Sequence, residues 1–354
     1  MSALLDDDPE LAGDETEILS DEDVVYQINT FGADFTVDGL IKRFEKGTIF
    51  KPEFQRNFVW SLPQASKFVE SILLGLPIPS IFLYREEETQ KLLIIDGLQR
   101  LTTLHAFYKG RLPHNDRVFK LTRVKSQYEG KTFDELSSED QLRFEDAVIH
   151  AMIVQQLAPD DSNSSVFHIF DRLNSNGTPL QAQEMRAAIY HGKYQNLLGT
   201  LNKNPDWRAV FGKEHKRAKD QELILRFLAL YYNADSYSKP MATFLNDFMN
   251  EYRNPSDQVV ETHGALFEDS IGRARAAFGE RAFRPQRTFN IAVFDSMMLG
   301  IARNPQASAA QIASAYEGLL ENGDFRQAIS EATSDENSVE RRINLACEYI
   351  EHAP

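Results

Sequence analysis

The spacing of apolar residues predicts alternating helices and strands in the first half of the chain. Helical spacing begins behind Thr36 and again behind Ser61, whose helix starts with proline and carries glutamine three residues after the cap. Gly47 and Gly75 end these two helices. Short apolar runs predict strands at 81–84, 92–95 and 147–157. This alternation indicates a mixed α/β N-terminal half.

The apolar period changes from strand to helix at Asp96-Gly97. Helices are expected at 97–110, 162–174 and 178–191. Irregular or extended segments, without a clean period, are expected at 51–60 and 111–145. The chain therefore runs from a strand through an Asp-Gly junction directly into a helix.

The second half of the chain is helical in period, and no strand is expected beyond Tyr194. Helical spacing is clearest at 221–232, 240–253, 288–303 and 311–322. The predicted fold class is α+β, a mixed α/β N-terminal domain followed by an all-helical C-terminal domain. The predicted divisions are an acidic tail at 1–23, the mixed domain at 24–200 and the helical domain at 201–354.

The net charge of −15 is concentrated at the N-terminus. Residues 1–23 hold ten of the 53 acidic residues and none of the 38 basic ones, which leaves 43 acidic against 38 basic elsewhere. We expect the tail to be a disordered, solvating segment; the alternative is a DNA mimic that covers a basic groove. The remaining chain can still present a local basic pocket, because local field governs phosphate binding.

Cysteine usage and hydropathy predict a cytoplasmic protein with no membrane partner. A single cysteine, Cys347, excludes an intramolecular disulfide and a zinc site built from cysteines. No apolar run approaches the length of a membrane span, and the N-terminus lacks the pattern of a secretory signal.

Common catalytic motifs are absent. Gly130-Lys131-Thr132 resembles the end of a P-loop, but the required earlier glycine is replaced by Lys125. The eight histidines are scattered, so a histidine-based metal site would need ligands from distant parts of the fold.

The densest candidate chemistry lies at the predicted strand–helix junction, in the sequence Asp96-Gly97-Leu98-Gln99-Arg100. A helix N-terminus favours an anion, and Arg100 adds a bidentate phosphate donor. Asp96 would repel a phosphate unless it holds Mg²⁺, and Gln99 would then orient a water or a base. Hydroxyl groups follow at Thr102 and Thr103. The alternative is structural: Asp96 and Gln99 form a capping box, and Arg100 is a solvated surface residue.

Two other stretches could support a nucleotide site. The segment 54–60 combines Gln55, Arg56, Phe58 and Trp60, which suits base stacking and a grip on phosphate; an ordinary aromatic anchor is the alternative. The helix–turn–helix connection after Phe170 is rich in polar residues. Its candidate side chains are Arg172, Asn174, Glu184 and Arg186. Caps with an Asn-Gly turn are the preferred account for 176–178, whereas Arg172, Glu184 and Arg186 lie inside predicted helices whose apolar faces are otherwise regular.

These motifs together resemble the GmrSD-type restriction-system N-terminal domain family, of the ParB/sulfiredoxin-like superfamily, which is defined by a DGQQR signature. The resemblance rests on four ordered stretches: FQRNFVW, SILLGLPIPSIFL, IIDGLQRLTTL and FDRLNSNGTPLQAQEMRAAIY. It covers about 35–195 and continues weakly to the segment 325–343. The resemblance implies a ParB-like nucleotide-binding fold that hydrolyses a nucleoside triphosphate, within bacterial defence against phage or foreign modified DNA.

The resemblance also implies site residues. The signature falls on Asp96, Gly97, Gln99 and Arg100. The Gln-Arg-Trp element falls on Gln55, Arg56 and Trp60, and the last element on Arg172, Asn174, Gly177, Glu184 and Arg186. In place of the first Gln of the signature stands Leu98, which shares a helix face with Leu101 and is expected to face the core.

Three functions remain open from the sequence. The leading hypothesis is a Mg²⁺-dependent nucleoside triphosphatase that acts with a separate nuclease, because residues 264–351 contain no histidine for a His-Asn-His nuclease. A non-catalytic sensor of DNA or nucleotide is the second, motivated by Leu98. The third is direct nicking of DNA. Two-metal nucleases usually need several carboxylates, and the junction supplies one.

Overall fold

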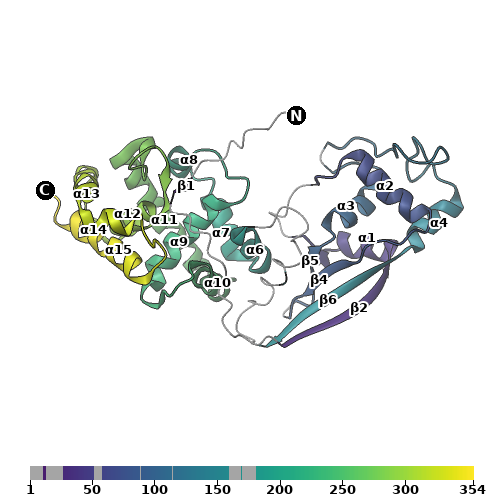
Figure 1. Ribbon diagram of the computed structural model, residues 1–354, viewed down its shortest axis with the longest axis horizontal. Coiled ribbons are helices and arrows are strands. Elements are labelled where there is room, and N and C mark those ends of the chain that lie inside the picture. Colours follow the sequence, from purple (N-terminus) through teal and green to yellow (C-terminus); the bar gives the residue numbers. More distant parts are fainter. Residues whose placement is uncertain are drawn as a thin grey trace. The chain divides into compact units, whose positions relative to one another are not determined.

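The computed structural model describes residues 11–12, 27–51, 58–87, 89–113, 115–158, 169 and 181–354. The chain divides into two compact units (Figure 1). The sheet unit comprises Val25–Leu180, and the helical unit comprises Met1–Val24 and Gln181–Pro354. The division falls at Leu180, ahead of the expected boundary at residue 200, because the first two helices after it pack against helices of the C-terminal half.

The sheet unit contains a five-stranded mixed sheet in the order β2-β6-β4-β5-β3. The β2–β6 and β4–β5 pairs are antiparallel, and the β6–β4 and β5–β3 pairs are parallel. Its strands are β2 (Gln27–Thr36), β3 (Ile49–Phe50), β4 (Ile81–Arg85), β5 (Leu92–Asp96) and β6 (Val148–Ala158). Its helices are α1 (Val37–Glu45), α2 (Leu62–Leu73), α3 (Leu98–Tyr108) and α4 (Ser138–Asp146). Figure 1 shows these helices on one side of the sheet.

One apolar core joins the four helices to that face of the sheet. Leu83, Ile94 and Ile153 supply it from three neighbouring strands, and Val69 and Leu104 from two of the helices. The expected helix starts are confirmed. The Thr36 hydroxyl accepts from the Gly39 N–H, and Ser61 forms a capping box at the start of α2. These caps satisfy amide groups that have no acceptor within the helix.

Three elements of the sheet unit were missed by sequence reasoning, one of them the two-residue strand β3 (Ile49–Phe50). The strand β2 begins well before Phe35, and its first residues are exposed because it is an edge strand paired only with β6. The helix α4 lies in the segment expected to be irregular, and it buries only Phe144, so its apolar period is too weak to detect. The helix expected at 162–174 lies outside the described residues, apart from a helical position at Ile169.

The helical unit is built almost entirely of helices. They are α6 (Ala182–Ile189), α7 (Lys193–Leu201), α8 (Pro205–Phe211), α9 (Lys219–Asn233), α10 (Met241–Glu251), α11 (Asp257–Phe278), α12 (Ile291–Arg303), α13 (Ala309–Glu321), α14 (Gly323–Ala328) and α15 (Glu336–Glu351). Two short 3₁₀ turns, Ala234–Ser236 and Gly279–Arg281, follow α9 and α11. The predicted fold class, a mixed α/β half followed by a helical half, is confirmed.

The helical unit also contains a two-stranded sheet. The strand β1 (Leu11–Ala12) pairs in parallel with β7 (Phe289–Asn290), so one two-residue strand does lie beyond Tyr194. Leu11 and Ala12 belong to the tail that was expected to be disordered, and the strand pair attaches them to the helical unit. The other residues of 1–23 lie outside the described part of the chain.

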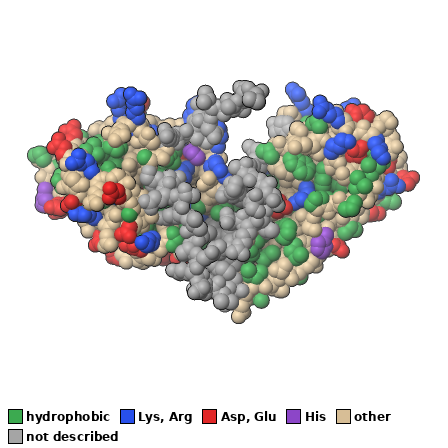
Figure 2. Space-filling view, viewed as in Figure 1, with side chains coloured by type: hydrophobic (Ala, Val, Ile, Leu, Met, Phe, Trp, Pro, Cys, Tyr) green, Lys and Arg blue, Asp and Glu red, His purple; other side chains and the backbone are tan. Residues whose placement is uncertain are grey.

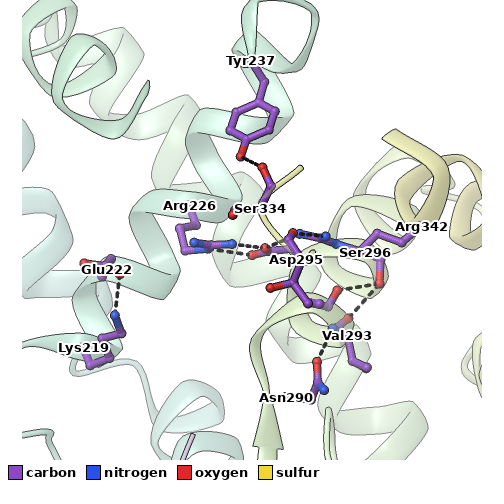
Figure 3. A network of polar contacts seen from close by, with 12 residues as sticks. Lys219, Glu222, Arg226, Tyr237, Asn290, Val293, Asp295, Ser296, Ser334 and Arg342 are labelled. Carbon is purple, nitrogen blue, oxygen red and sulfur yellow. Dashed lines mark hydrogen bonds and ion pairs between the residues drawn. The ribbon is translucent and has the colours of Figure 1, made fainter. Parts of the chain in front are cut away.

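A buried charge network holds the centre of the helical unit together (Figure 3). The carboxylate of Asp295 on α12 accepts from Arg226 on α9 at 2.6 Å and from Arg342 on α15 at 3.2 Å. Asp295 and Arg342 are fully buried. Because unpaired buried charges are costly, this network fixes how the three helices pack.

Within the described segments, no helix is both long enough and apolar enough to cross a membrane.

Candidate functional site

The Asp-Gly junction lies where β5 ends and α3 begins, and it brings Asp96 and Arg100 together. Asp96 is the last residue of β5, and Arg100 lies in the first turn of α3. The Arg100 Nη2 donates to the Asp96 Oδ2 in a charge-assisted bond. Asp96 is 45% exposed at its side chain and Arg100 16%. The pair therefore sits at a partly open edge of the unit, with the carboxylate outward.

Gly97 is required at this junction for two reasons. Its φ of +100° lies in the left-handed region, which side chains rarely adopt. A Cβ there would also lie 2.5 Å from the Ile81 Cγ2 and 3.4 Å from the Arg100 Nε. The absence of a side chain thus lets β5 turn sharply into α3 and lets the guanidinium of Arg100 fold back to Asp96.

Gln99 does not close a capping box with Asp96. Its Oε1 accepts from the backbone N–H groups of Val59 at 2.9 Å and Trp60 at 3.3 Å. The N-cap of α3 is Gly97, and no side chain caps it. The structural alternative from the sequence is therefore wrong for this residue. Gln99 instead ties the segment 58–60 to the first turn of α3.

The two threonines after the signature differ in exposure. The Thr103 side chain is fully buried, and its hydroxyl donates to the Gln99 carbonyl at 2.7 Å. This bond within the helix leaves Thr103 facing away from the surface, so it does not fit a phosphate contact. Thr102 is partly exposed. Leu98 is buried in the core, as its spacing predicted, so a leucine at this signature position packs without disturbing the surface.

The start of α3 has backbone donors that no side chain of the described residues caps. The Nε of Arg100 is buried and makes no hydrogen bond with the described residues. An unpaired buried donor costs about 1–3 kcal/mol. An anion at this point would satisfy these donors and would also meet the positive end of the helix dipole.

The aromatic residues of the segment 58–60 are partly buried. The rings of Trp60 and Phe68 meet edge to face with centroids 5.5 Å apart, so Trp60 anchors the segment on α2. Phe58 also packs against the core. Gln55 and Arg56, the other members of this element, lie outside the described residues.

The last predicted element belongs in part to the helical unit. Arg186 is buried on α6, and its nitrogens donate to Gln183, Glu222 and Asn246 and, at 3.5 Å, to the Ala242 carbonyl. Burial alone would raise the pKa of the Glu222 carboxyl, but Lys219 and Arg186 outweigh it and lower the pKa to about 2. Arg186 thus serves the packing of α6, α9 and α10.

Glu184 is also committed within the helical unit. Its Oε2 accepts from the Gln181 N–H at 2.7 Å and from Arg217 at 3.1 Å. This carboxylate caps the start of α6 and pairs with a cation there. The remaining members, Arg172, Asn174 and Gly177, lie outside the described residues.

The described side chains fit Mg²⁺ only together with a nucleotide. No cluster of three or more His, Cys, Asp or Glu side chains suited to a metal occurs in the described part of the chain. Mg²⁺ is commonly bound through one or two carboxylates plus substrate phosphates and water. The partly exposed Asp96 suits that arrangement, whereas a cage made by the protein alone does not.

Sequence reasoning missed the groups that Gln99 and Gly97 contact. The partners of Gln99 are the backbone N–H groups of Val59 and Trp60, which carry no side-chain signal. The close neighbour of Gly97 is Ile81, an ordinary strand residue. The one local signal was the glycine itself, at a strand-to-helix turn.

The chain matches a known protein and a known family, each over part of its length. An uncharacterized protein of Methanocaldococcus jannaschii is 29% identical over 98 residues, which covers 21% of this chain and 17% of that protein. The aligned region is thus about a sixth of that relative's length. Residues 37–191 match the family described as "GmrSD restriction endonuclease, N-terminal domain".

The family match contains the whole strand–helix junction and the segment that Gln99 holds. The description of that family names the N-terminal domain of a restriction endonuclease. The stretch 37–191, less than half of the chain, therefore belongs to the GmrSD-type N-terminal domain family.

Proposed function

We propose that this chain is the nucleoside triphosphate-hydrolysing component of a restriction-type antiphage system and acts with a separate nuclease. The observation that carries the proposal is the Asp96–Arg100 pair at an uncapped helix N-terminus. It combines a carboxylate that can meet a metal with a guanidinium and amide groups that can meet phosphates.

The proposed roles follow from what each side chain already contacts. Arg100 binds phosphate through donors that Asp96 does not use, and its buried Nε supports this role. Gln99 is a positioning residue, because its Oε1 holds the backbone at Val59 and Trp60. Trp60 or Phe58 contacts the base. Thr102 lies in the first turns of α3, the helix that also carries Arg100.

Four residues enter the proposed site through the family resemblance: Gln55, Arg56, Arg172 and Asn174. Arg56 precedes Phe58 by two residues and would add a second phosphate contact. Thr103, Glu184 and Arg186 are left outside the site, because their polar groups are already engaged within the protein.

Asp96 would hold a Mg²⁺ ion that arrives with the nucleotide. Such an ion neutralises charge that develops on the transferred phosphoryl group. The chain's own contribution is to bind and orient. The uncapped amide groups and Arg100 fix the phosphates, and Gln99 fixes the segment that contacts the base.

Phosphate release from ATP and GTP by the purified full chain, with and without Mg²⁺, tests the proposal. We expect turnover by the wild type and a loss of at least about tenfold in Asp96→Asn and in Arg100→Ala, which corresponds to roughly 1.4 kcal/mol. The matched controls are Asp38→Asn and Lys42→Ala, because that pair on α1 has the same four-residue spacing but is a surface ion pair. Equal rates in all five proteins contradict the proposal.

The same measurements separate the competing functions. Nucleotide binding that depends on Arg100, without turnover in any condition, would favour a non-catalytic sensor. The buried position of Leu98 argues against that reading, since the substitution that motivated it faces the core. Nicking of plasmid DNA that is lost in Asp96→Asn would instead favour a nuclease.

A further inference from the structure

The sheet unit carries a basic surface in the segment between α3 and α4. Residues 120–131 hold four basic residues and one acidic residue, Glu129, in a chain whose net charge is −15. Three of the four basic side chains are exposed, and that of Lys131 is partly exposed. Figure 2 shows Lys and Arg side chains along the upper edge of the sheet unit, where Figure 1 places α2 and the loop that follows α3. We define the 120–131 basic surface by its four basic residues, Lys120, Arg123, Lys125 and Lys131.

The charges of this surface are not paired with carboxylates. None of the four side chains forms an ion pair with a carboxylate of the described segments. Lys109, at the end of α3, differs from them because it pairs with Glu45 at 2.6 Å. The one acidic residue of the segment is also engaged, since the Glu129 Oε2 accepts from the Val124 N–H at 3.0 Å. The surface therefore keeps a local positive potential that an anion can meet.

Buried side chains of α2 fix the turn that carries Arg123 and Lys125. The Ser66 hydroxyl accepts from the Thr122 N–H at 3.1 Å, and the Glu70 carboxylate accepts from the Lys125 N–H at 2.6 Å. Ser66 and Glu70 are both buried. Between these bonds Arg123 has a φ of +57°, in the left-handed region that residues other than glycine rarely adopt. Such a conformation persists only where the surrounding contacts impose it, so the fold holds an exposed arginine at this turn.

Lys120 and Lys131 lie near each other on the adjoining turn. The Leu121 N–H donates to the Lys131 carbonyl at 2.9 Å, which brings the two ends of the segment together. A hydrogen bond from the Thr132 N–H lowers the pKa of the Glu135 carboxyl. Lys120 and Lys131 lower that pKa further, so both ammonium groups lie near this one carboxylate. The four cations thus stand on one short segment whose backbone is fixed at several points.

This arrangement suits duplex DNA better than an acidic peptide. Duplex DNA carries one negative charge per about 1.7 Å of its axis, whereas an extended peptide carries at most one per about 3.3 Å. A compact group of cations therefore meets more anionic groups on a duplex. Arg123 can bind a phosphate through two parallel N–H bonds, and the exposed Ser126 and Gln127 carry groups of the kind that donate to phosphate oxygens.

We propose that the 120–131 basic surface binds the phosphate backbone of double-stranded DNA without reading its sequence. The segment follows the end of α3, whereas Asp96 and Arg100 lie at the start of that helix. A helix of this length extends about 16 Å, so the DNA contact is separate from the proposed nucleotide site. The proposal is independent of nucleotide hydrolysis.

Anisotropy of a fluorescein-labelled duplex of mixed sequence, titrated with the full chain at several salt concentrations, tests the proposal. The loop variant combines Lys120→Ala, Arg123→Gly and Lys125→Ala, with glycine chosen because it suits the left-handed backbone at 123. We expect this variant to bind at least about tenfold more weakly than the wild type at about 0.1 M salt. The slope of log K against log salt should become shallower by about 2–3, because each lost phosphate contact removes about 0.9.

A matched control removes three exposed basic side chains from other parts of the surface, in Lys91→Ala, Lys203→Ala and Arg326→Ala. Its net charge equals that of the loop variant, but it should keep wild-type affinity, because distant charges are screened beyond about 10 Å at about 0.1 M salt. Circular dichroism and thermal unfolding confirm that each variant is folded. Equal losses in the two variants, or no salt-dependent binding by the wild type, overturn the proposal. Polyglutamate of equal charge that binds as tightly as the duplex, and that also needs the 120–131 basic surface, overturns DNA as its occupant.

Discussion

The Oε1 of Gln99 accepts a hydrogen bond from the backbone N–H of Val59, at 2.9 Å and forty residues earlier in the chain. This bond connects the first turn of α3 to the segment that leads into α2. Gln99 is thereby a structural link between two of the stretches on which the family resemblance rests. This link supports treating the two stretches as one site in the proposed function.

Replacing Gln99 tests that link. Gln99→Ala removes the acceptor of two backbone N–H groups and should lower the unfolding free energy by about 1 kcal/mol. It should also weaken nucleotide binding, because the segment 58–60 loses its hydrogen bonds to α3. Gln99→Glu keeps the acceptor oxygen and should retain most of the affinity. Chemical denaturation and equilibrium nucleotide binding measure the two effects.

Gln64 provides the control for that substitution. Its Oε1 also accepts a hydrogen bond from a backbone N–H, that of Ser61, in the capping box of α2. Gln64→Ala should cost a similar amount of stability but leave nucleotide affinity unchanged. If Gln99→Ala affects only stability, as Gln64→Ala does, Gln99 has no positioning role.

Gly97→Ala should destabilise the sheet unit by about 1–3 kcal/mol. The left-handed backbone and the clash with Ile81 both oppose a side chain there. Gly47→Ala is the control, since Gly47 has a φ of +66° but no atom within 4 Å of an added Cβ, and it should cost only about 1 kcal/mol. Denaturant unfolding of both variants separates the steric part from the backbone part. Equal costs would show that Ile81 gives way easily.

Asp295→Ala should destabilise the helical unit by about 3–5 kcal/mol, because it leaves the buried cations of Arg226 and Arg342 without their shared carboxylate. Asp257→Ala is the control: Asp257 pairs with Lys193 at 2.7 Å, but its side chain is 86% exposed, so little change in stability is expected. Chemical unfolding of the full chain measures both. A small effect at Asp295 would mean that water reaches the network.

His263 should make the stability of the helical unit depend on pH in the mildly acidic range. Burial lowers the pKa of His263 from 6.5 to about 4. Its ring stacks on Tyr232, and its Nδ1 pairs with the Tyr194 hydroxyl at 2.8 Å. The unfolded chain binds a proton at His263 more readily than the folded chain does. The stability that depends on a neutral His263 is therefore complete above about pH 6.5 and declines as the pH falls toward 4.

His263→Phe removes the titrating group and should flatten this part of the stability profile. The comparison rests on the slope of the unfolding free energy between pH 6.5 and 4, not on its absolute value, because the variant also leaves the buried Tyr194 hydroxyl without its partner. An unchanged slope would assign the pH dependence to other groups.

Local chemistry in the sequence was enough to predict most elements of the sheet unit. Thr36 and Ser61 marked helix starts because hydroxyl caps act within one turn. The strand-to-helix change at Asp96-Gly97 was equally readable, because the apolar period changes at that point. The buried position of Leu98 followed from its three-residue spacing to Leu101.

Elements that depend on distant partners were not readable. The strand β2 shows exposed residues over its first half and exists as a strand because β6 pairs with it along its length. The pairing of Leu11 with Phe289 joins residues at opposite ends of the chain, and no local period announces it. Arg186 looked like a binding residue because a charged side chain interrupts an apolar helix, and only the folded unit shows its partners Glu222 and Asn246.

By itself, the sequence determined that a carboxylate, a glycine, a glutamine and an arginine stand together where a strand becomes a helix. The tertiary structure decided what they contact. Arg100 turns back to Asp96, while Gln99 reaches Val59 and leaves the helix start uncapped. The physical reason is that capping and periodicity act over a few residues. A side chain's choice between a nearby and a distant backbone amide depends on packing of the whole unit.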